Sequence, residues 1–330
     1  MKIAEAVKGD RTKLHRIGHA LAKAHEDLGD VAGAMTWLSV AKAGWRGDYS
    51  ASADHGRFVA ATASADVMLA GGFADARPIF VVGMPRTGTT LVERILSSHS
   101  EVGSAGETTQ FTLALRRATG LPGRGGVIDA RLIGEATGAD AAAIGRDYMR
   151  AIATTQGLTG RFVEKNPFNA LLAPLILKAL PEARVVMLRR HPADVVLSSY
   201  RQDFAEVGGM LDYTFDLEAT ARYVVRFGAM AKRFAETLPK DRYREVTYEG
   251  VVANLDGQVR GLLDFCGLGF EEACVHFEDN ASPVATASAA QVRQPIYASS
   301  VGRWRKYRPV IDPALRVLVE GGVMDAAELA

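Results

Sequence analysis

The sequence predicts an α/β fold of the P-loop type, with a parallel sheet between two layers of helices and an N-terminal helical extension. Three observations favour this class. Short apolar segments alternate with helical patterns from residue 78 onward, a glycine-bounded loop follows the first of these segments, and residues 1 to about 70 show helical periodicity alone. The composition, with 48% hydrophobic and 23% charged residues, is that of an ordinary globular protein with a sizeable core.

Four segments have the character of strands. Residues 78–83 and 183–188 are short and rich in valine and isoleucine, as expected of parallel strands buried on both faces, and residues 161–164 and 243–247 are the other two. Ligands of such sheets bind at the carboxyl ends of the strands, so we expect the loops after the first three strands to converge. Helical patterns separate the strands, at residues 89–98, 139–158, 168–180, 192–200, 216–238 and 251–265.

The N-terminal region repeats apolar residues at steps of three and four, the period of a helix, at Leu14, Ile17, Leu21, Ala24 and Leu28. Gly29 and Asp30 interrupt this pattern, and a second helix follows. Residues 20–30 resemble part of a tetratricopeptide unit, although an ordinary helical hairpin fits equally well. Fewer than three such units form no solenoid, so we expect these helices to pack on the main domain, on a protein partner or on a second copy. The predicted domains are residues 1–70 and 78–330.

Charge and cysteine content exclude several classes of protein. A formal net charge of +1 argues against nucleic-acid binding, and the basic residues of segment 303–308 are better explained by a bound phosphate or by a solvated surface. Cys266 and Cys274 have neither metal-ligand spacing nor the number needed for a disulfide framework. No apolar run is long enough to span a membrane and no signal peptide is evident, so a cytoplasmic location is expected.

The loop after the first strand has the spacing of a P-loop. Gly83 and Gly88 match the pattern GxxxxGK[ST], but Thr89 stands where the lysine belongs, and the positive charge lies inside the loop at Arg86. Such a loop followed by a helix favours a bound phosphate. Because an NTPase of this type needs the lysine, we expect a phosphate ester that is not hydrolysed as ATP.

The third strand ends in a second cationic site. Arg190 follows this strand, and Ser198 lies eight residues later on the next helix. A Walker-B strand would end in an aspartate that holds Mg²⁺. A strand that ends in arginines is suited to an anion, because a guanidinium offers a planar fork of donors. We therefore expect no metal at this site.

Together these features resemble the sulfotransferases that use 3′-phosphoadenosine-5′-phosphosulfate (PAPS). The resemblance covers roughly residues 78–308. Within the family, the chain is similar to the bacterial type with tetratricopeptide-like N-terminal helices, which shares chemistry with the tyrosylprotein sulfotransferases. It implies that the loop binds the 5′-phosphosulfate and that Arg190 and Ser198 bind the 3′-phosphate. The cofactor-binding residues that it implies are Arg86, Thr87, Gly88, Thr89, Thr90, Arg190, Ser198, Tyr248 and Arg303.

The same resemblance implies catalytic roles for four residues. Glu107, which lies 21 residues after Arg86, corresponds to the family's general base, although it could also face solvent or cap a helix. Lys165 and Arg86 would contact the transferring sulfuryl group, and Ser288 would lie near the bridging oxygen. Tyr248 corresponds to an aromatic residue that accompanies the site, although it could equally belong to the core.

The implied reaction is a metal-free in-line transfer of the sulfuryl group from PAPS to an acceptor hydroxyl, with adenosine 3′,5′-bisphosphate as the product. A carboxylate base favours a phenol, such as tyrosine, over an alcohol, because a phenol has a pKa of about 10. Two alternatives stay open: a small-molecule kinase with a divergent P-loop, and a non-catalytic nucleotide-binding protein that recruits a partner. The sequence does not name the acceptor or the oligomeric state.

Overall fold

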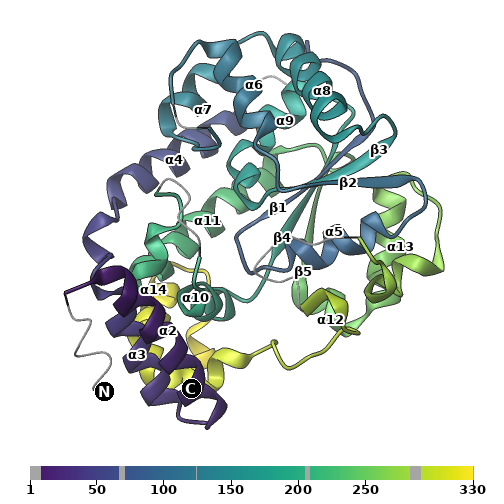
Figure 1. Ribbon diagram of the computed structural model, residues 1–330. Helices are drawn as coiled ribbons and strands as arrows, with labels where there is room; N and C mark the ends of the chain where they lie inside the picture. The colour runs from purple at the N-terminus through teal and green to yellow at the C-terminus, as the bar shows by residue number, and fades with distance from the viewer. Residues whose placement is uncertain (1–8, 67–70, 124, 205–208, 283–290, 330) are drawn as a thin grey trace. The chain divides into compact units, whose positions relative to one another are not determined.

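The computed structural model describes residues 9–66, 71–123, 125–204, 209–282 and 291–329 (Figure 1). Its internal contacts divide the chain into two compact units. The first unit comprises the described residues up to Asp54, together with those of 191–228 and 299–330, and the second comprises those of 55–190 and 229–298. Helices α4 (Ala51–Ala63) and α11 (Leu217–Thr237) continue from one unit into the other. A compact unit need not fold independently, so the boundary near residue 78 stays a prediction.

The second unit contains a parallel five-stranded sheet of order β2-β3-β1-β4-β5. The strands are β1 (Pro78–Gly83), β2 (Val102–Gly106), β3 (Arg161–Lys165), β4 (Arg184–Arg189) and β5 (Tyr243–Thr247). The four predicted strands are confirmed to within one residue at each end. β2 was not predicted. It is an edge strand, and its sequence, VGSAG, contains no apolar run that would indicate a strand.

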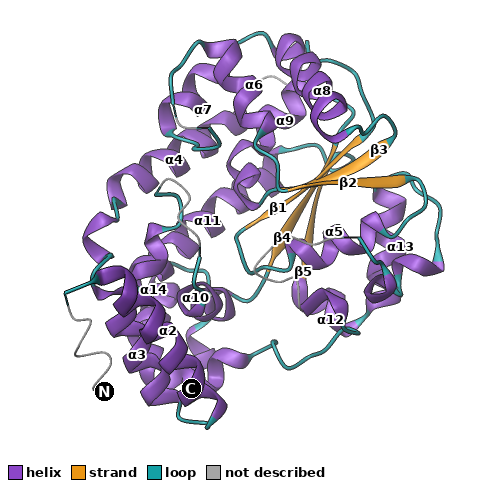
Figure 2. Cartoon of the chain, viewed as in Figure 1, coloured by secondary structure: helices purple, strands orange, loops and turns teal. Residues whose placement is uncertain are grey.

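Helices cover both faces of this sheet, so the predicted three-layer arrangement is confirmed (Figure 2). Ile79 and Val81 belong to an apolar cluster that includes α5 (Thr89–Ser97) and α13 (Leu255–Phe265). The intervening Phe80 packs on the opposite face, where its ring lies near those of Phe111 on α6 (Gln110–Thr119) and Tyr148 on α8 (Ala141–Gln156). The remaining helices of this unit are α7 (Ala130–Ala136), α9 (Ala173–Ala179) and α12 (Tyr248–Ala253).

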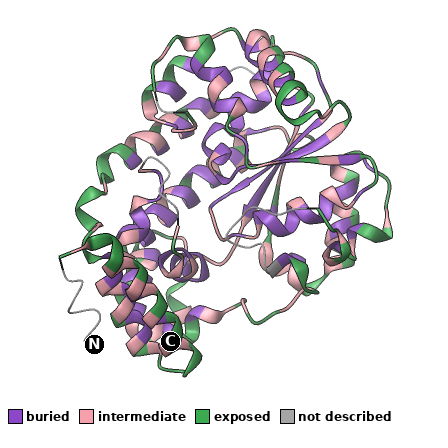
Figure 3. Cartoon of the chain, in the orientation of Figure 1, coloured by how far each residue is buried: buried purple, intermediate pink, exposed green. Residues whose placement is uncertain are grey.

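The central strand is buried throughout. All six residues of β1 are buried, and Figure 3 shows the central strands of the sheet in the colour of buried residues. This explains why β1 reads as an unbroken apolar run, since a parallel strand between two helical layers has no solvent-facing side.

The first unit contains the predicted N-terminal helices, α2 (Arg11–Asp27) and α3 (Val31–Ala43). Asp10 and Asp30 accept hydrogen bonds from backbone N–H groups in the first turn of each helix, which explains where the two helices begin. At Gly18 the helices approach so closely that a Cβ atom would lie 2.6 Å from the Cβ of Ala41. The helical hairpin is thus confirmed, and the tetratricopeptide resemblance stays a prediction.

A buried carboxylate joins α10 (Pro192–Arg201) to the C-terminal segment within the first unit. Asp194 accepts hydrogen bonds from the backbone N–H groups of Gly302 at 2.7 Å and Trp304 at 2.9 Å. His191 stacks on Trp304 with ring centroids 5.5 Å apart. These contacts fix the start of the 3₁₀ helix Arg303–Tyr307, which leads into α14 (Arg308–Glu320). Among the described residues, no helix combines the length and the apolar character required to cross a membrane.

Candidate active site at the strand ends

Every strand of the sheet ends at, or within three residues before, a residue that the sequence analysis singled out. Arg86 follows β1, Glu107 follows β2, Lys165 is the last residue of β3, Arg190 follows β4, and Tyr248 follows β5. Because all the strand pairs are parallel, these carboxyl ends share one edge of the sheet. The topology therefore gathers five candidate residues from distant parts of the sequence at the edge where ligands of such sheets bind.

The loop between β1 and α5 has an unusual backbone. Arg86 has a φ of 72°, and it is the one non-glycine residue with positive φ among those the structure describes. Holding such a residue in the left-handed region costs about 1–2 kcal/mol, and such strain concentrates at functional sites. The Thr87 hydroxyl donates to the carbonyl of Met84 at 2.7 Å and closes the loop from within. The N-terminus of α5 follows directly, and its dipole favours an anion there.

Arg190 and Tyr248 pack against this loop. The Arg190 Nη1 group donates to the carbonyl of Arg86 at 3.0 Å, and its guanidinium carbon lies 4.6 Å from the centroid of the Tyr248 ring. At Gly88, a Cβ atom would lie 2.8 Å from Tyr248 Cδ2, and φ is 100°, so this position needs glycine for both space and conformation. We call Arg86, Gly88, Arg190 and Tyr248 the loop cluster. Its cationic groups and helix N-terminus are the donors that a phosphate requires.

A second group of charges lies at the ends of β2 and β3. Lys165 is fully buried and forms an ion pair with Glu107, whose side chain is 46% exposed. The Lys165 Nζ atom also lies 4.0 Å from a carboxylate oxygen of Glu93 on α5. Two carboxylates thus offset one buried ammonium, as a buried charge requires. Lys165 and Glu107 lie 58 positions apart in the sequence, and no local sequence pattern predicts that they pair.

Glu93 is a residue that sequence reasoning missed. It accepts a hydrogen bond from the Ser104 hydroxyl at 2.7 Å, and burial raises its pKa, an effect that the nearby Lys165 ammonium opposes. Its only sequence signal was a carboxylate three residues after Thr90, on the helix that follows the loop. That signal is weak, because acidic residues are common near helix N-termini.

Glu164 is a second residue that was missed, and it supports the end of β3 from the interior. Its carboxylate accepts hydrogen bonds from the Tyr148 hydroxyl at 2.5 Å and from Asn169 Nδ2 at 2.6 Å. Complete burial raises the pKa of Glu164 from 4.5 to about 7, although these hydrogen bonds oppose the shift. A carboxyl group beside Lys165 in sequence is thus held rigidly, and it changes charge near neutral pH.

The Glu164→Gln variant should remove a pH dependence of stability. Between pH 4.5 and about 7 the folded protein keeps a proton on Glu164 that the unfolded chain releases, so the free energy of unfolding of the wild type falls as pH rises through this window. The fall from this group should be about 3 kcal/mol, since each pKa unit corresponds to about 1.4 kcal/mol. Urea unfolding across this window measures it. The variant should lack this fall, and the exposed Glu182→Gln control should retain it; parallel curves for all three proteins would refute the assignment.

Three of the predicted site residues do not belong to the described part of the second unit. Ser198 is on α10 and Arg303 begins the 3₁₀ helix, both in the first unit, and Ser288 lies outside the described residues. Arg303 donates to a carboxylate oxygen of Glu26 at 2.7 Å, and Arg201 and the Tyr307 hydroxyl bind the same carboxylate. The cofactor roles of these residues stay predictions. Thr87 is buried in the loop, and Thr89 and Thr90 are buried in the first turn of α5.

Comparison with known proteins agrees with the architecture. Residues 78–272, which span all five strands, match the sequence model of the family described as the sulfotransferase family. The sequence is 34% identical to an uncharacterized protein of Aquifex aeolicus (strain VF5) over 76% of this chain and 33% of that protein. It is 23% identical to a protein-tyrosine sulfotransferase of Drosophila melanogaster over 68% of this chain and 46% of the relative.

The chain therefore spans between a third and a half of the length of these two relatives. Among solved structures, the sulfotransferase domain of the Synechococcus PCC 7002 olefin synthase superposes with a TM-score of 0.52 at 17% identity. That superposition covers 77% of this chain and 96% of the domain, and it supports the fold.

Proposed function

We propose, because this chain belongs to the sulfotransferase family, that it transfers a sulfuryl group from PAPS to an acceptor hydroxyl. The observation that carries the proposal is the contact of Arg190 with the backbone of the loop at Arg86. The Arg190 guanidinium contacts the backbone of Arg86 there, beside a helix N-terminus, and no aspartate ends β4 in the manner of a Walker-B strand. This donor set suits a nucleotide that carries phosphate at both sugar positions.

In this proposal the loop cluster holds the nucleotide. The loop and the N-terminus of α5 bind the 5′-phosphate end, and Arg190 binds the 3′-phosphate through its guanidinium fork. Ser198 and Arg303 are proposed to add donors, and Ser288 is proposed to lie near the bridging oxygen. Arg86 and Lys165 would stabilise the charge that develops on the transferring group and on the leaving oxygen, as cationic clamps do in phosphoryl transfer.

Glu107 is proposed to remove the proton of the acceptor hydroxyl. Two observations support this role: the Glu107 side chain is partly exposed, so an incoming acceptor could reach it, and it forms an ion pair with Lys165. A base takes the proton of the attacking hydroxyl, and a neighbouring cation can stabilise the charge that develops on the transferring group. A carboxylate is better matched to a phenol than to an alcohol. We therefore propose a phenolic acceptor, and the similarity to protein-tyrosine sulfotransferases supports tyrosine within this class.

Ligand-dependent thermal unfolding tests the proposal. Adenosine 3′,5′-bisphosphate at 100 times its dissociation constant should stabilise the protein by about 2.7 kcal/mol, because it binds the folded state alone. Adenosine 5′-monophosphate, which lacks the 3′-phosphate, should stabilise it much less at the same concentration. ATP with Mg²⁺ is the arm that detects a kinase. Stabilisation by ATP and Mg²⁺ without any by the bisphosphate would replace this proposal with the kinase alternative.

A further inference from the structure

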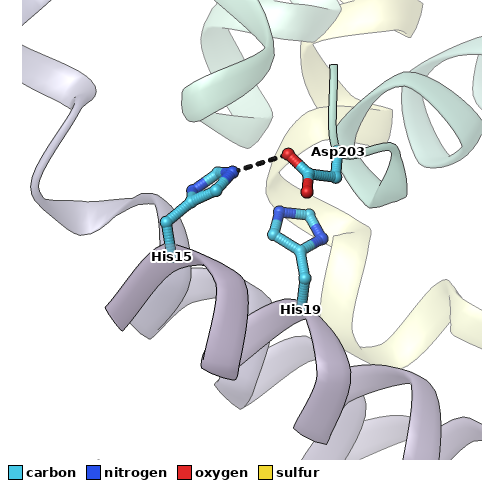
Figure 4. Close-up of side chains that lie close together, drawn as sticks. All are labelled: His15, His19 and Asp203. Carbon is cyan, nitrogen blue, oxygen red and sulfur yellow. Dashed lines mark hydrogen bonds and ion pairs between the residues drawn. The ribbon is translucent and has the colours of Figure 1, made fainter. Parts of the chain in front are cut away.

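Two histidines and an aspartate lie close together in the first unit. The proposed transfer reaction does not use them. His15 and His19 lie one turn apart on α2, and Asp203 follows the end of α10 (Figure 4). Residues four apart on a helix share a face, so both imidazoles can reach one point. The potential ligand atoms of the three residues lie within 4.8 Å of one another. We call these residues the His-His-Asp cluster.

The hydrogen bond of His15 fixes which nitrogen faces the cluster. His15 Nδ1 lies 3.1 Å from the carbonyl of Ala41, and a carbonyl can only accept, so Nδ1 must carry a proton. Nε2 then points at a carboxylate oxygen of Asp203 at 2.9 Å (Figure 4). Two acceptors at this distance require a proton or a cation between them. A ligating histidine whose other nitrogen donates to a carbonyl is the usual arrangement around a metal ion.

His19 presents a second ligand with no competing bond. Its Nε2 atom is buried, and no described residue hydrogen-bonds to it. A buried nitrogen without a partner is costly, and a metal ion would satisfy it.

Lys42 is a positively charged neighbour of His19, and a metal ion at this site would have to tolerate it. Its Nζ atom donates to the carbonyl of Gln202 at 3.3 Å, and burial lowers the pKa of Lys42 to about 7. The same Nζ atom lies 5.3 Å from the centroid of the Tyr200 ring and 5.6 Å from that of Phe215, and these ring contacts with the carbonyl bond offset its charge. The aromatic rings of Trp45 and Phe215 flank His15, with centroids 6.1 and 6.3 Å away.

From this geometry we propose that the His-His-Asp cluster is a binding site for a divalent transition-metal ion, with Zn²⁺ as the best match. Two imidazoles and one carboxylate are a common set of zinc ligands, and a fourth position would hold water. Tetrahedral zinc with bonds of about 2.0–2.2 Å needs ligand atoms about 3.3 Å apart. The ligand atoms of the cluster lie within 4.8 Å of one another, and Asp203 is exposed, so burial does not fix its carboxylate.

Such an ion would tie the N-terminal helix α2 to the segment after α10 inside the first unit. Glu26 on α2 already binds Arg201 of α10, so the metal would reinforce an existing link between the same two elements. Its role would be structural, and it takes no part in the proposed transfer reaction. The inference does not depend on the proposed function, and it uses residues of the other compact unit.

Metal titration of the untagged, chelator-treated full chain tests the site. The wild type should bind one equivalent of Zn²⁺ saturably, its unfolding temperature should rise with Zn²⁺, and Co²⁺ should give the intense visible absorption of a four-coordinate site. Asp203→Asn, at an exposed position, and His19→Ala should each weaken binding by at least about tenfold, the lower end of the loss caused by removing even an outer partner of a metal ligand.

The exposed His55→Ala variant is the matched control, because it removes a histidine outside the cluster. It should bind Zn²⁺ as the wild type does. Absence of a saturable equivalent in the wild type, or unchanged affinity in both cluster variants, would overturn the proposal. If His19→Ala fails to fold, Asp203→Asn alone decides the question.

Discussion

Replacement of Glu107 by glutamine should lower turnover by about 10²–10⁴-fold, the usual contribution of a general base, while affinity for adenosine 3′,5′-bisphosphate stays nearly unchanged. The amide keeps the shape of the side chain but cannot take a proton from the acceptor. Glu107 sits beside the fully buried Lys165, so the variant also removes one of the two carboxylates near that ammonium. Glu93 remains to offset the charge, and we therefore expect the variant to fold. Steady-state kinetics with PAPS and a phenolic acceptor measure the effect.

Two companion variants make this result specific. Glu101→Gln changes an exposed carboxylate just before β2 and should leave turnover as in the wild type. Glu93→Gln removes the other carboxylate near Lys165 without touching Glu107. If Glu93→Gln abolished turnover while Glu107→Gln remained active, the base would be Glu93, and the role proposed for Glu107 would be wrong.

Replacement of Arg190 by alanine should weaken binding of adenosine 3′,5′-bisphosphate by about 10–100-fold, since hydrogen bonds to a charged group contribute about 1.5–3 kcal/mol. Adenosine 5′-monophosphate should lose much less, because it offers no 3′-phosphate to this side chain. Part of any common loss would come from the loop, whose Arg86 carbonyl accepts a hydrogen bond from Arg190. Isothermal titration with both nucleotides separates the two effects.

The neighbouring Arg189 provides the matched control. It ends β4 and pairs with Glu245 at 3.3 Å, so Arg189→Ala removes an equal charge from the adjacent position. Both nucleotides should bind this variant nearly as they bind the wild type. Equal weakening of the two nucleotides by Arg190→Ala would contradict a role in binding the 3′-phosphate and would leave Arg190 as a support of the loop.

Local sequence patterns predicted the centre of the sheet but not its edge. β1 and β4 are buried on both faces, so their apolar runs are visible without any knowledge of the fold. β2 borders the sheet and is built from small residues, and its strand character depends on pairing with β3, which no short segment encodes. The helical hairpin α2–α3 was predictable because helical periodicity and aspartate caps are local signals.

The candidate site likewise combines features that local sequence patterns predict with features that depend on long-range contacts. The loop with Arg86 and the arginine after β4 have motifs of their own, and the parallel topology explains why their strand ends meet. The links of Lys165 to Glu107 and of His15 to Asp203 bridge 58 and 188 residues, so only the folded chain reveals them. Glu164 was missed for another reason: a charged residue in a strand reads as solvent-facing, whereas here Tyr148 and Asn169 satisfy it in the interior.

The central claim is that the strand ends form one site for an adenine nucleotide with phosphates at both the 3′ and the 5′ position. A crystal structure with adenosine 3′,5′-bisphosphate bound tests it most directly. The 5′-phosphate should lie against the backbone of residues 86–90, and the 3′-phosphate should contact the Arg190 guanidinium. A nucleotide bound away from the carboxyl ends of β1 and β4, or a 3′-phosphate that does not touch Arg190, would contradict the account.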